Sequence, residues 1–164
     1  MKNLFDYIRQ NKSNYDLILL TSTFQYAIDY LLKYHKIFDL FTELFCVKSK
    51  LGNADDEQVI YISERKKHDC QDCGPFGCKY FDYREFCENH DIKQYLKTIF
   101  ICDGKNDLCL AKNLKKNDVV FARKNFYLAK KLINEGYKNE ISAEVFEWTS
   151  GDEIINYLKE LNRK

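Results

Sequence analysis

The feature that most constrains this chain is an alternation of short apolar runs with segments of helical spacing. The apolar runs are bounded by polar residues and are too short for buried helices, so they predict buried strands. Between them, apolar residues recur every three or four positions, which places them on one face of a helix. This alternation predicts an α/β fold, a doubly wound parallel sheet with helices on both faces. The expected strands are Tyr15–Thr21, Thr42–Val47, Thr98–Cys102, Asp118–Phe121 and Ala143–Phe146.

The expected helices lie between these strands, and the last begins at Ser150 with a capping box completed by Glu153. Residues 48–56 are polar and are expected to form a loop, whereas Val59 and Tyr61 suggest a short strand of an insertion that covers residues 49–78. The other expected helices are Phe24–Tyr34, Lys79–Asn89, Asn106–Lys115 and Phe126–Asn134, which stops at Gly136.

Length and charge narrow the classes of function. With 164 residues, the chain predicts one domain, 1–164. Its 26 basic and 25 acidic residues nearly cancel, so no overall field attracts nucleic acid or an anionic membrane, and neither is an expected partner. No apolar run approaches the ~20 residues of a membrane helix, and the first ten residues do not resemble a secretory signal. We therefore expect a cytoplasmic protein.

Seven cysteines without a secretory signal predict reduced thiols and a metal site more than a disulfide framework. His68, Cys70, Cys73 and Cys78 supply four ligands of the kind that bind Zn²⁺ tetrahedrally. The alternative is a set of reduced thiols that pack a tight loop. The remaining cysteines are interpreted as small core residues. They are Cys46, Cys87, Cys102 and Cys109.

Polar side chains follow one of the predicted strands directly, in the sequence Asp103-Gly104-Lys105-Asn106-Asp107. Ligands of open α/β sheets bind beyond the carboxyl ends of the strands. Carboxylate and amide oxygens suit a hard cation such as Mg²⁺, and Gly104 permits a tight turn beside it. An ordinary turn is the alternative, because Asp-Gly and Asn-Asp are common turn sequences.

Two further elements are candidates for phosphate binding. Thr21 and Ser22 end the first predicted strand and precede a helix, so hydroxyls and free helix N–H groups could cradle a phosphate. Serine and threonine are also ordinary helix caps. Lys79 opens a predicted helix and offers a cation, although a lysine on a helix is usually a surface residue.

These elements occur in the order strand-Thr21, Cys78-Lys79, then Asp103-Gly104-Lys105-Asn106-Asp107. That order resembles motifs two, three and four of the haloacid-dehalogenase superfamily. The cysteines around Lys79 and Asp107 make the chain similar to its phosphoethanolamine/phosphocholine and pyridoxal-phosphate phosphatases. The resemblance implies a Rossmannoid fold, a small phosphorylated metabolite as substrate and Mg²⁺ as cofactor. It implies that Asp103 holds Mg²⁺ and that Asp107 supports the metal site and orients Lys79. It also implies that Lys79 offsets the charge of phosphate and nucleophile, and that Thr21 with Ser22 binds the phosphoryl group.

The superfamily's first motif, Asp-x-Asp-x-Thr, does not occur in this sequence. In the family this motif supplies the aspartate nucleophile, from a strand between those that end at Thr21 and Asp103. The subfamily's second motif resembles Ser-Asp-x-Asn, whereas Phe24 stands here at its last position. The expectation is an incomplete core without nucleophile strand or cap, inactive or truncated as a phosphatase. The alternative is a non-catalytic binding or scaffold protein that keeps the fold.

Overall fold

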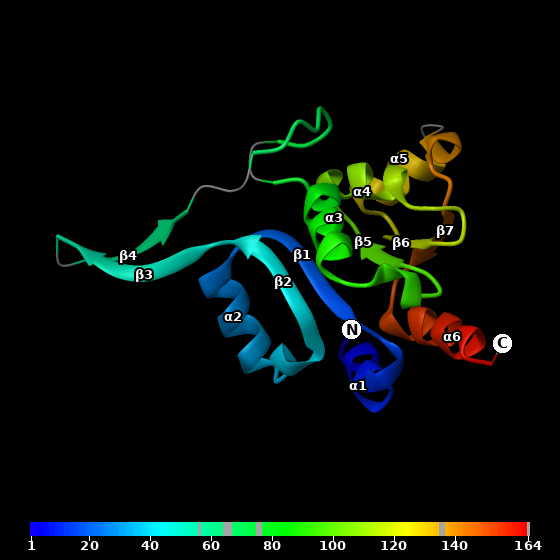
Figure 1. The fold of residues 1–164 in the computed structure, drawn as a ribbon, viewed down its shortest axis with the longest axis horizontal. Coiled ribbons are helices and arrows are strands. Elements are labelled where there is room, and N and C mark those ends of the chain that lie inside the picture. Colours follow the sequence, from blue (N-terminus) through cyan, green and yellow to red (C-terminus); the bar gives the residue numbers. More distant parts are fainter. Residues whose placement is uncertain (56, 64–66, 75–76, 135–136, 164) are drawn as a thin grey trace.

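The computed structural model describes residues 1–55, 57–63, 67–74, 77–134 and 137–163 (Figure 1). Strands and helices alternate along most of the chain, as the sequence predicts. In chain order the elements are α1 (Lys2–Gln10), β1 (Leu17–Phe24), α2 (Gln25–Tyr34), β2 (Phe41–Val47), β3 (Ser49–Ala54), β4 (Glu57–Ile62), α3 (Lys79–Asn89), β5 (Ile99–Cys102), α4 (Leu108–Asn113), β6 (Val119–Arg123), α5 (Tyr127–Asn134), β7 (Glu144–Trp148) and α6 (Gly151–Leu161).

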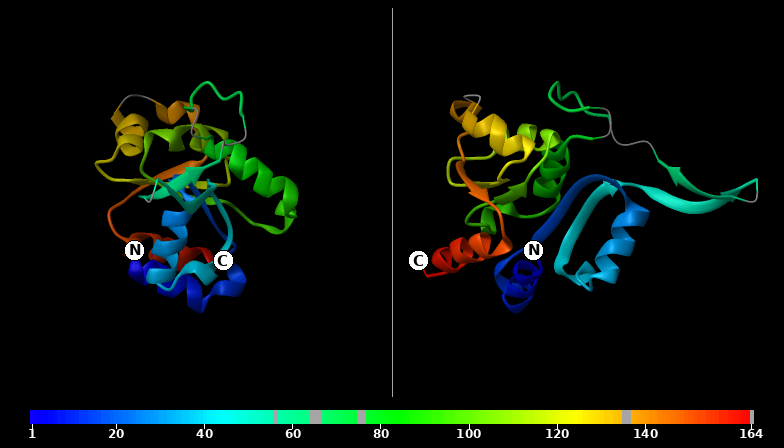
Figure 2. Two further views of the ribbon diagram at one scale, coloured as in Figure 1. Left: turned by 90° about the vertical axis from the view of Figure 1, so that its left-hand side faces the viewer. Right: turned by 180° about the vertical axis from the view of Figure 1, so that it is seen from behind.

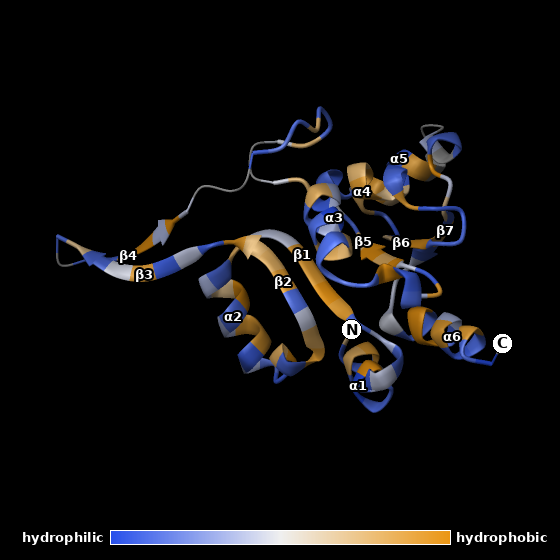
Figure 3. Cartoon of the chain, viewed as in Figure 1, coloured by the Kyte–Doolittle hydropathy of each residue, from blue (hydrophilic) through white to orange (hydrophobic). Residues whose placement is uncertain are grey.

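The main core surrounds a parallel sheet of three strands in the order β5-β6-β7. Successive residues of β6 point to opposite faces, and all but Arg123 are buried. Val120 and Ala122 pack with α4 and α5, whereas Val119 and Phe121 pack with α1 and α6. The sheet therefore has helices on both faces, which confirms the predicted α/β class (Figure 3).

A second parallel sheet joins β1 to β2, and α2 packs beside it. β3 and β4 form a separate antiparallel hairpin with Ser49 opposite Ile62. Figures 1 and 2 show this hairpin extending away from the rest of the molecule. Its strands are mostly exposed, because neither face packs on a core.

β1 and β5 lie on facing edges of the two parallel sheets, and within the described residues they are not hydrogen-bonded to each other. A cavity of about 400 Å³ lies between the beginnings of these strands, lined by Leu17 and Ile18 on one side and by Thr98 and Ile99 on the other. Tyr83 of α3 also lines it. Within the described residues, β1 and β5 are thus each hydrogen-bonded to a neighbouring strand along one edge only.

Several predicted boundaries are confirmed, and others are wrong. The helix Lys79–Asn89 matches α3, and Glu153 Oε2 accepts a hydrogen bond from the Ser150 N–H (3.2 Å) at the start of α6. Residues 48–56 were expected to be a loop, but they contain β3, which is held by pairing with β4 rather than by burial. The segment Asn106–Lys115 is not one helix, because a 3₁₀ turn, Lys105–Asp107, precedes α4. Gly136 lies outside the described residues.

None of the helices in the described ranges has the length and apolar character needed to cross a bilayer. The longest, α3 and α6, have 11 residues each, about half of the ~20 that a bilayer requires.

Candidate functional site

The loop after β5 is organised around the buried carboxylate of Asp107. Asp107 Oδ2 accepts hydrogen bonds from the backbone N–H groups of Asp103 (2.9 Å) and Gly104 (2.6 Å). Gly104 has an extended backbone, so its glycine is not required by a positive φ. A Cβ there would instead lie 3.0 Å from Asn106 Oδ1 and 3.5 Å from Asp107 Oδ2. The predicted tight turn thus serves close approach of backbone to carboxylate.

Lys79, the first residue of α3, reaches the other oxygen of this carboxylate. Its ammonium donates a hydrogen bond to Asp107 Oδ1, and the side chains are 16% and 1% exposed. With both oxygens engaged, the orientation of Asp107 is fixed by groups from two separate elements. This contact places an ammonium group at the carboxyl end of β5, and Asp107 takes one of its three N–H donors.

Arg123 adds a second cation that the sequence analysis did not assign to the site. It is the last residue of β6, which neighbours β5, and its Nη1 lies 3.8 Å from Asp103 Oδ2. Its guanidinium lies over the rings of Phe126 (4.2 Å) and Trp148 (5.5 Å). The signal available in the sequence was its position just after the predicted strand Asp118–Phe121, because ligands bind beyond the carboxyl ends of strands in such sheets.

The donor chemistry at Asp103 fits the implied Mg²⁺. Its carboxylate follows β5 directly and is 49% exposed, so its oxygens can reach solvent and a bound ligand. Mg²⁺ typically takes one or two protein carboxylates and completes its six oxygens with water and substrate phosphate. Asp107, whose oxygens bind Lys79 and two N–H groups, fits a positioning role better than a ligand role.

The predicted phosphate cradle at Thr21 and Ser22 differs from expectation. β1 continues to Phe24 and α2 begins at Gln25, so the two hydroxyl residues lie within the strand rather than at a helix N-terminus. Thr21 Oγ1 accepts a hydrogen bond from the Thr23 N–H (3.2 Å). Leu20 packs against the same core cluster as Tyr80, the neighbour of Lys79. The convergence of Thr21 and Ser22 with Lys79 stays a prediction.

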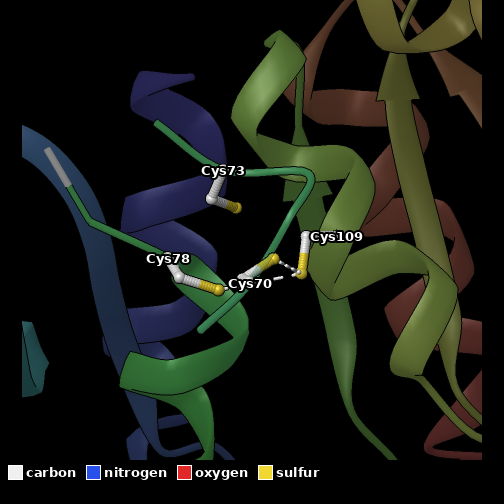
Figure 4. Close-up of side chains that lie close together, drawn as sticks. All are labelled: Cys70, Cys73, Cys78 and Cys109. Carbon is white, nitrogen blue, oxygen red and sulfur yellow. Dashed lines mark hydrogen bonds between the residues drawn. The ribbon is translucent and has the colours of Figure 1, made fainter. Parts of the chain in front are cut away.

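The structure places three of the four predicted zinc ligands, Cys70, Cys73 and Cys78, close together. The fourth residue of this group is Cys109 rather than His68. The sulfurs of Cys70, Cys73, Cys78 and Cys109 all lie within 4.8 Å of one another (Figure 4). His68 instead lines a neighbouring cavity of about 420 Å³. Its ring nitrogens are buried and have no hydrogen-bond partner in the described part of the chain. Cys109 was interpreted as a core residue, and it is indeed buried, but its sulfur belongs to this cluster.

Crowding in this cluster changes the acidity of its thiols. Burial, together with the thiols of Cys70 and Cys78, raises the pKa of Cys73 to about 12. Burial and the same two neighbours also raise the pKa of Cys109. Burial, the largest single influence, opposes ionisation of Cys70 as well, but hydrogen bonds from Cys109, the Asp72 backbone, Cys73 and Cys78 together outweigh it and lower the pKa of Cys70. One thiolate is thus favoured, and each further ionisation is resisted by the charge already present.

Comparison with known proteins identifies relatives along the whole chain. The family model described as Putative Phosphatase matches residues 1–162. Pyridoxal phosphate phosphatase of Bos taurus is 31% identical over 163 residues, which are 97% of this chain and 66% of the relative. The phosphoethanolamine/phosphocholine phosphatase of Gallus gallus is 26% identical, covering 100% of this chain and 62% of the relative. A thiamine phosphate phosphatase-like protein of Arabidopsis thaliana is 28% identical, covering 97% and 66%.

The chain therefore spans about two thirds of the length of these curated relatives. No solved structure matches it significantly.

Proposed function

This chain belongs to the Putative Phosphatase family of the haloacid-dehalogenase superfamily, and from that membership we propose that residues 1–164 form the phosphate-binding and metal-binding part of a Mg²⁺-dependent phosphomonoester hydrolase. The substrate class is a small phosphorylated metabolite of the phosphocholine, phosphoethanolamine or pyridoxal phosphate type, after the names of the relatives. The observation that carries the proposal is the contact of Lys79 with Asp107 in the loop that begins at Asp103.

In this proposal Lys79 binds the phosphoryl oxygens. Its ammonium is a compact charge with three donors, and Asp107 takes one of them. Because Asp107 is locked by two backbone N–H groups, it fixes the direction of the ammonium and lowers the reorganisation needed when an anion binds. Asp107 therefore acts as a positioning residue.

Asp103 would hold the magnesium ion. The ion, when bound, neutralises charge on the phosphoryl oxygens and orients the group for displacement. Arg123 lies on the same side of the sheet, so we assign it a supporting role in attracting the anionic substrate toward Asp103. Thr21 and Ser22 are proposed to donate hydroxyl hydrogen bonds to the phosphate across the gap between β1 and β5.

The nucleophile is the missing part of this site. No Asp-x-Asp-x-Thr motif occurs among the 164 residues, and loss of a nucleophile costs on the order of 10⁶ in turnover in a well-studied hydrolase. We propose that a strand with this motif would fit between β1 and β5, whose facing edges are unpaired in the described residues. The absence of this motif from the 164 residues also favours the second candidate function, a protein that binds phosphomonoesters without hydrolysing them.

Binding is the first test. Isothermal titration calorimetry of the chain with pyridoxal phosphate and phosphocholine, each in excess Mg²⁺, should detect binding of at least one of them. Lys79→Met should weaken that binding about tenfold or more, because it removes a charge-assisted contact. Lys93→Met is the matched control, since Lys93 is an exposed lysine after α3 and should leave binding unchanged. Equal affinities for Lys79→Met and wild type would overturn the assignment of Lys79.

Turnover separates the two candidate functions. The chain alone should release little phosphate, whereas a version extended by a strand bearing Asp-x-Asp-x-Thr should hydrolyse the ligand that binds. The matched control carries Asn in place of the first Asp of that strand. Gain of activity in the extended chain, absent from its Asn control, supports the hydrolase proposal. Tight binding with no turnover in either version favours the binding protein.

A further inference from the structure

The four-cysteine cluster lies outside the phosphate site and is drawn from three separate segments. Cys70 and Cys73 come from the loop before α3, Cys78 immediately precedes α3, and Cys109 lies in α4. Cys109 Sγ is 3.2 Å from Cys70 Sγ and 3.7 Å from Cys78 Sγ. Figure 4 shows the four side chains pointing toward a common centre.

We propose that Cys70, Cys73, Cys78 and Cys109 bind one Zn²⁺ ion. Four thiolates at a Zn–S distance of ~2.3 Å place their sulfurs about 3.8 Å apart. The Cys109 sulfur lies 3.2 Å and 3.7 Å from those of Cys70 and Cys78, and no pair of the four sulfurs is more than 4.8 Å apart, so the cluster has about the size that a zinc ion requires. Thiolates are soft ligands that select Zn²⁺ over Mg²⁺, so this site and the oxygen site at Asp103 favour different metals.

Two alternatives fit the cluster less well. A disulfide would use two sulfurs, whereas four converge here. Packing of thiols as small apolar groups suits Cys78 and Cys109, which are buried, but it does not explain the loop. In the described parts of the loop between Lys67 and Gly77, no residue is buried. A loop that lacks its own core requires another source of order, and a structural metal supplies it.

The proposed ion would connect the two elements that form the phosphate site. Cys78 directly precedes Lys79 in the sequence, and Cys109 is two residues after Asp107. The ion would therefore hold α3 against α4 at the place where the lysine and the aspartate meet. Asp72 in the same loop also lies 3.8 Å from Lys112 Nζ of α4, which brings the loop to the same helix. This positional consequence rests on the proposed function, but the metal site itself does not.

Metal content is the direct test. The full chain, expressed in zinc-supplemented medium and freed of loosely bound metal, should contain about one zinc per chain by mass spectrometry. Cys70→Ser and Cys73→Ser should lose most of that zinc; both cysteines are half-buried and lie in the loop before α3, outside the sheet core. Cys87→Ser is the matched control, because Cys87 is a half-buried cysteine of α3 outside the cluster. It should keep the full zinc content.

Spectroscopy of the wild-type chain identifies the ligands without relying on a variant. Reconstitution with Co²⁺ under reducing conditions should give the intense visible bands of a tetrahedral ion and thiolate-to-metal charge transfer in the near ultraviolet. A weak spectrum of the octahedral, oxygen-ligated type would overturn the proposal. So would zinc below about a tenth of an equivalent after reconstitution, or equal zinc in wild type and Cys70→Ser. None of these readouts involves phosphate, so failure here is distinct from failure of the proposed function.

Discussion

Asp107 is a fully buried carboxylate whose three partners come from two elements. A buried charge is tolerated when it is paired and hydrogen-bonded, and both conditions hold here. The same burial makes the site sensitive, since removal of the carboxylate would leave an ammonium and two N–H groups without their partner. The residue thus joins stability to the geometry of the proposed phosphate site.

Asp107→Ala is expected to lower the free energy of unfolding by about 3–5 kcal/mol, measured by urea denaturation at pH 7. Asp107→Asn should cost less, because the amide oxygen still accepts from the Asp103 and Gly104 N–H groups. The control Glu88→Ala removes an exposed partner of Arg84 and should change stability by no more than about 0.5 kcal/mol. A change below about 1 kcal/mol for Asp107→Ala would contradict this account.

At the scale of single residues, the sequence predicted which types of side chain form the site better than it predicted which residues contact one another. Lys79 and Asp107 were paired through a resemblance, and their contact is present. The predicted zinc set contained His68 because it is close in sequence to Cys70. Cys109 replaces it because α4 packs against α3, a tertiary contact that spacing along the chain cannot show. Arg123 was missed for the same reason, since its proximity to Asp103 arises from the pairing of β6 with β5.

At the scale of elements, α1 is a short helix whose apolar side covers the sheet face opposite the α4 and α5 side. Leu4 is buried in a cluster with Phe121 of β6 and Ile154 of α6. The close packing extends to the backbone, because a Cβ at Gly151 would lie 3.1 Å from Leu4 Cβ. α1 therefore completes the second layer of helices rather than extending into solvent.

Leu4→Ala is expected to destabilise the chain by about 2–5 kcal/mol, through lost burial and the cavity that remains. The midpoint of thermal unfolding followed by circular dichroism measures the effect. Lys2→Ala, on the exposed side of the same helix, should leave the midpoint nearly unchanged. A Leu4→Ala midpoint equal to that of Lys2→Ala would show that α1 is not part of the cooperative core.

Asp16 connects elements across the cavity between the sheets. Its carboxylate accepts hydrogen bonds from the hydroxyls of Tyr95 (2.7 Å) and Thr42 (2.8 Å). These bonds, that of Tyr95 first, hold the pKa of Asp16 below its usual value. A lowered folded-state pKa stabilises the fold above the unfolded pKa of about 3.9, and that contribution is lost as the pH falls through the lower folded value.

Asp16→Asn should therefore lower the unfolding midpoint at pH 7 by more than at pH 3. The physical reason is that the unfolded state takes up the proton first, at about pH 3.9, so the stabilisation supplied by ionised Asp16 is already smaller at pH 3 than at pH 7. Urea denaturation of both proteins at the two pH values measures the difference. Tyr95→Phe, which deletes the first of the two hydrogen bonds, should follow the same pattern. A difference between wild type and Asp16→Asn that grows toward pH 3 would contradict the assigned sign.

Elements with a core face were predictable, and those without one were not. β6 is a continuous apolar run because both of its faces are buried. β3 was expected to be loop because Lys50, Gly52 and Asn53 give it neither an apolar run nor a clean alternation. Its strand form depends on hydrogen bonds to β4 in a hairpin that extends away from the molecule, and such pairing leaves little trace in hydropathy (Figure 1).

At the scale of the whole molecule, two parallel sheets meet along a line where backbone pairing is absent in the described residues. What joins them is side-chain contact, including Leu20 in one core cluster and Leu17 in the other. His90 and Glu43 add a link across the same boundary at 3.2 Å. Side-chain contacts alone resist local opening less than a shared ladder of hydrogen bonds, so the two sheets are expected to differ in local stability.

Amide hydrogen exchange followed by mass spectrometry should reveal this difference. Peptides that cover β6 should exchange slowest, because that strand is paired on both edges and buried on both faces. Peptides that cover β1 should exchange faster, since one edge lacks a strand partner in the described residues and the strand is only partly buried. The extended chain with an added Asp-x-Asp-x-Thr strand should slow exchange in β1 and β5 while leaving the β3–β4 hairpin unchanged. Equal protection of β1 and β6 in the unextended chain would mean that the two sheets open as one unit. The missing backbone pairing between β1 and β5 would then have no effect on local stability.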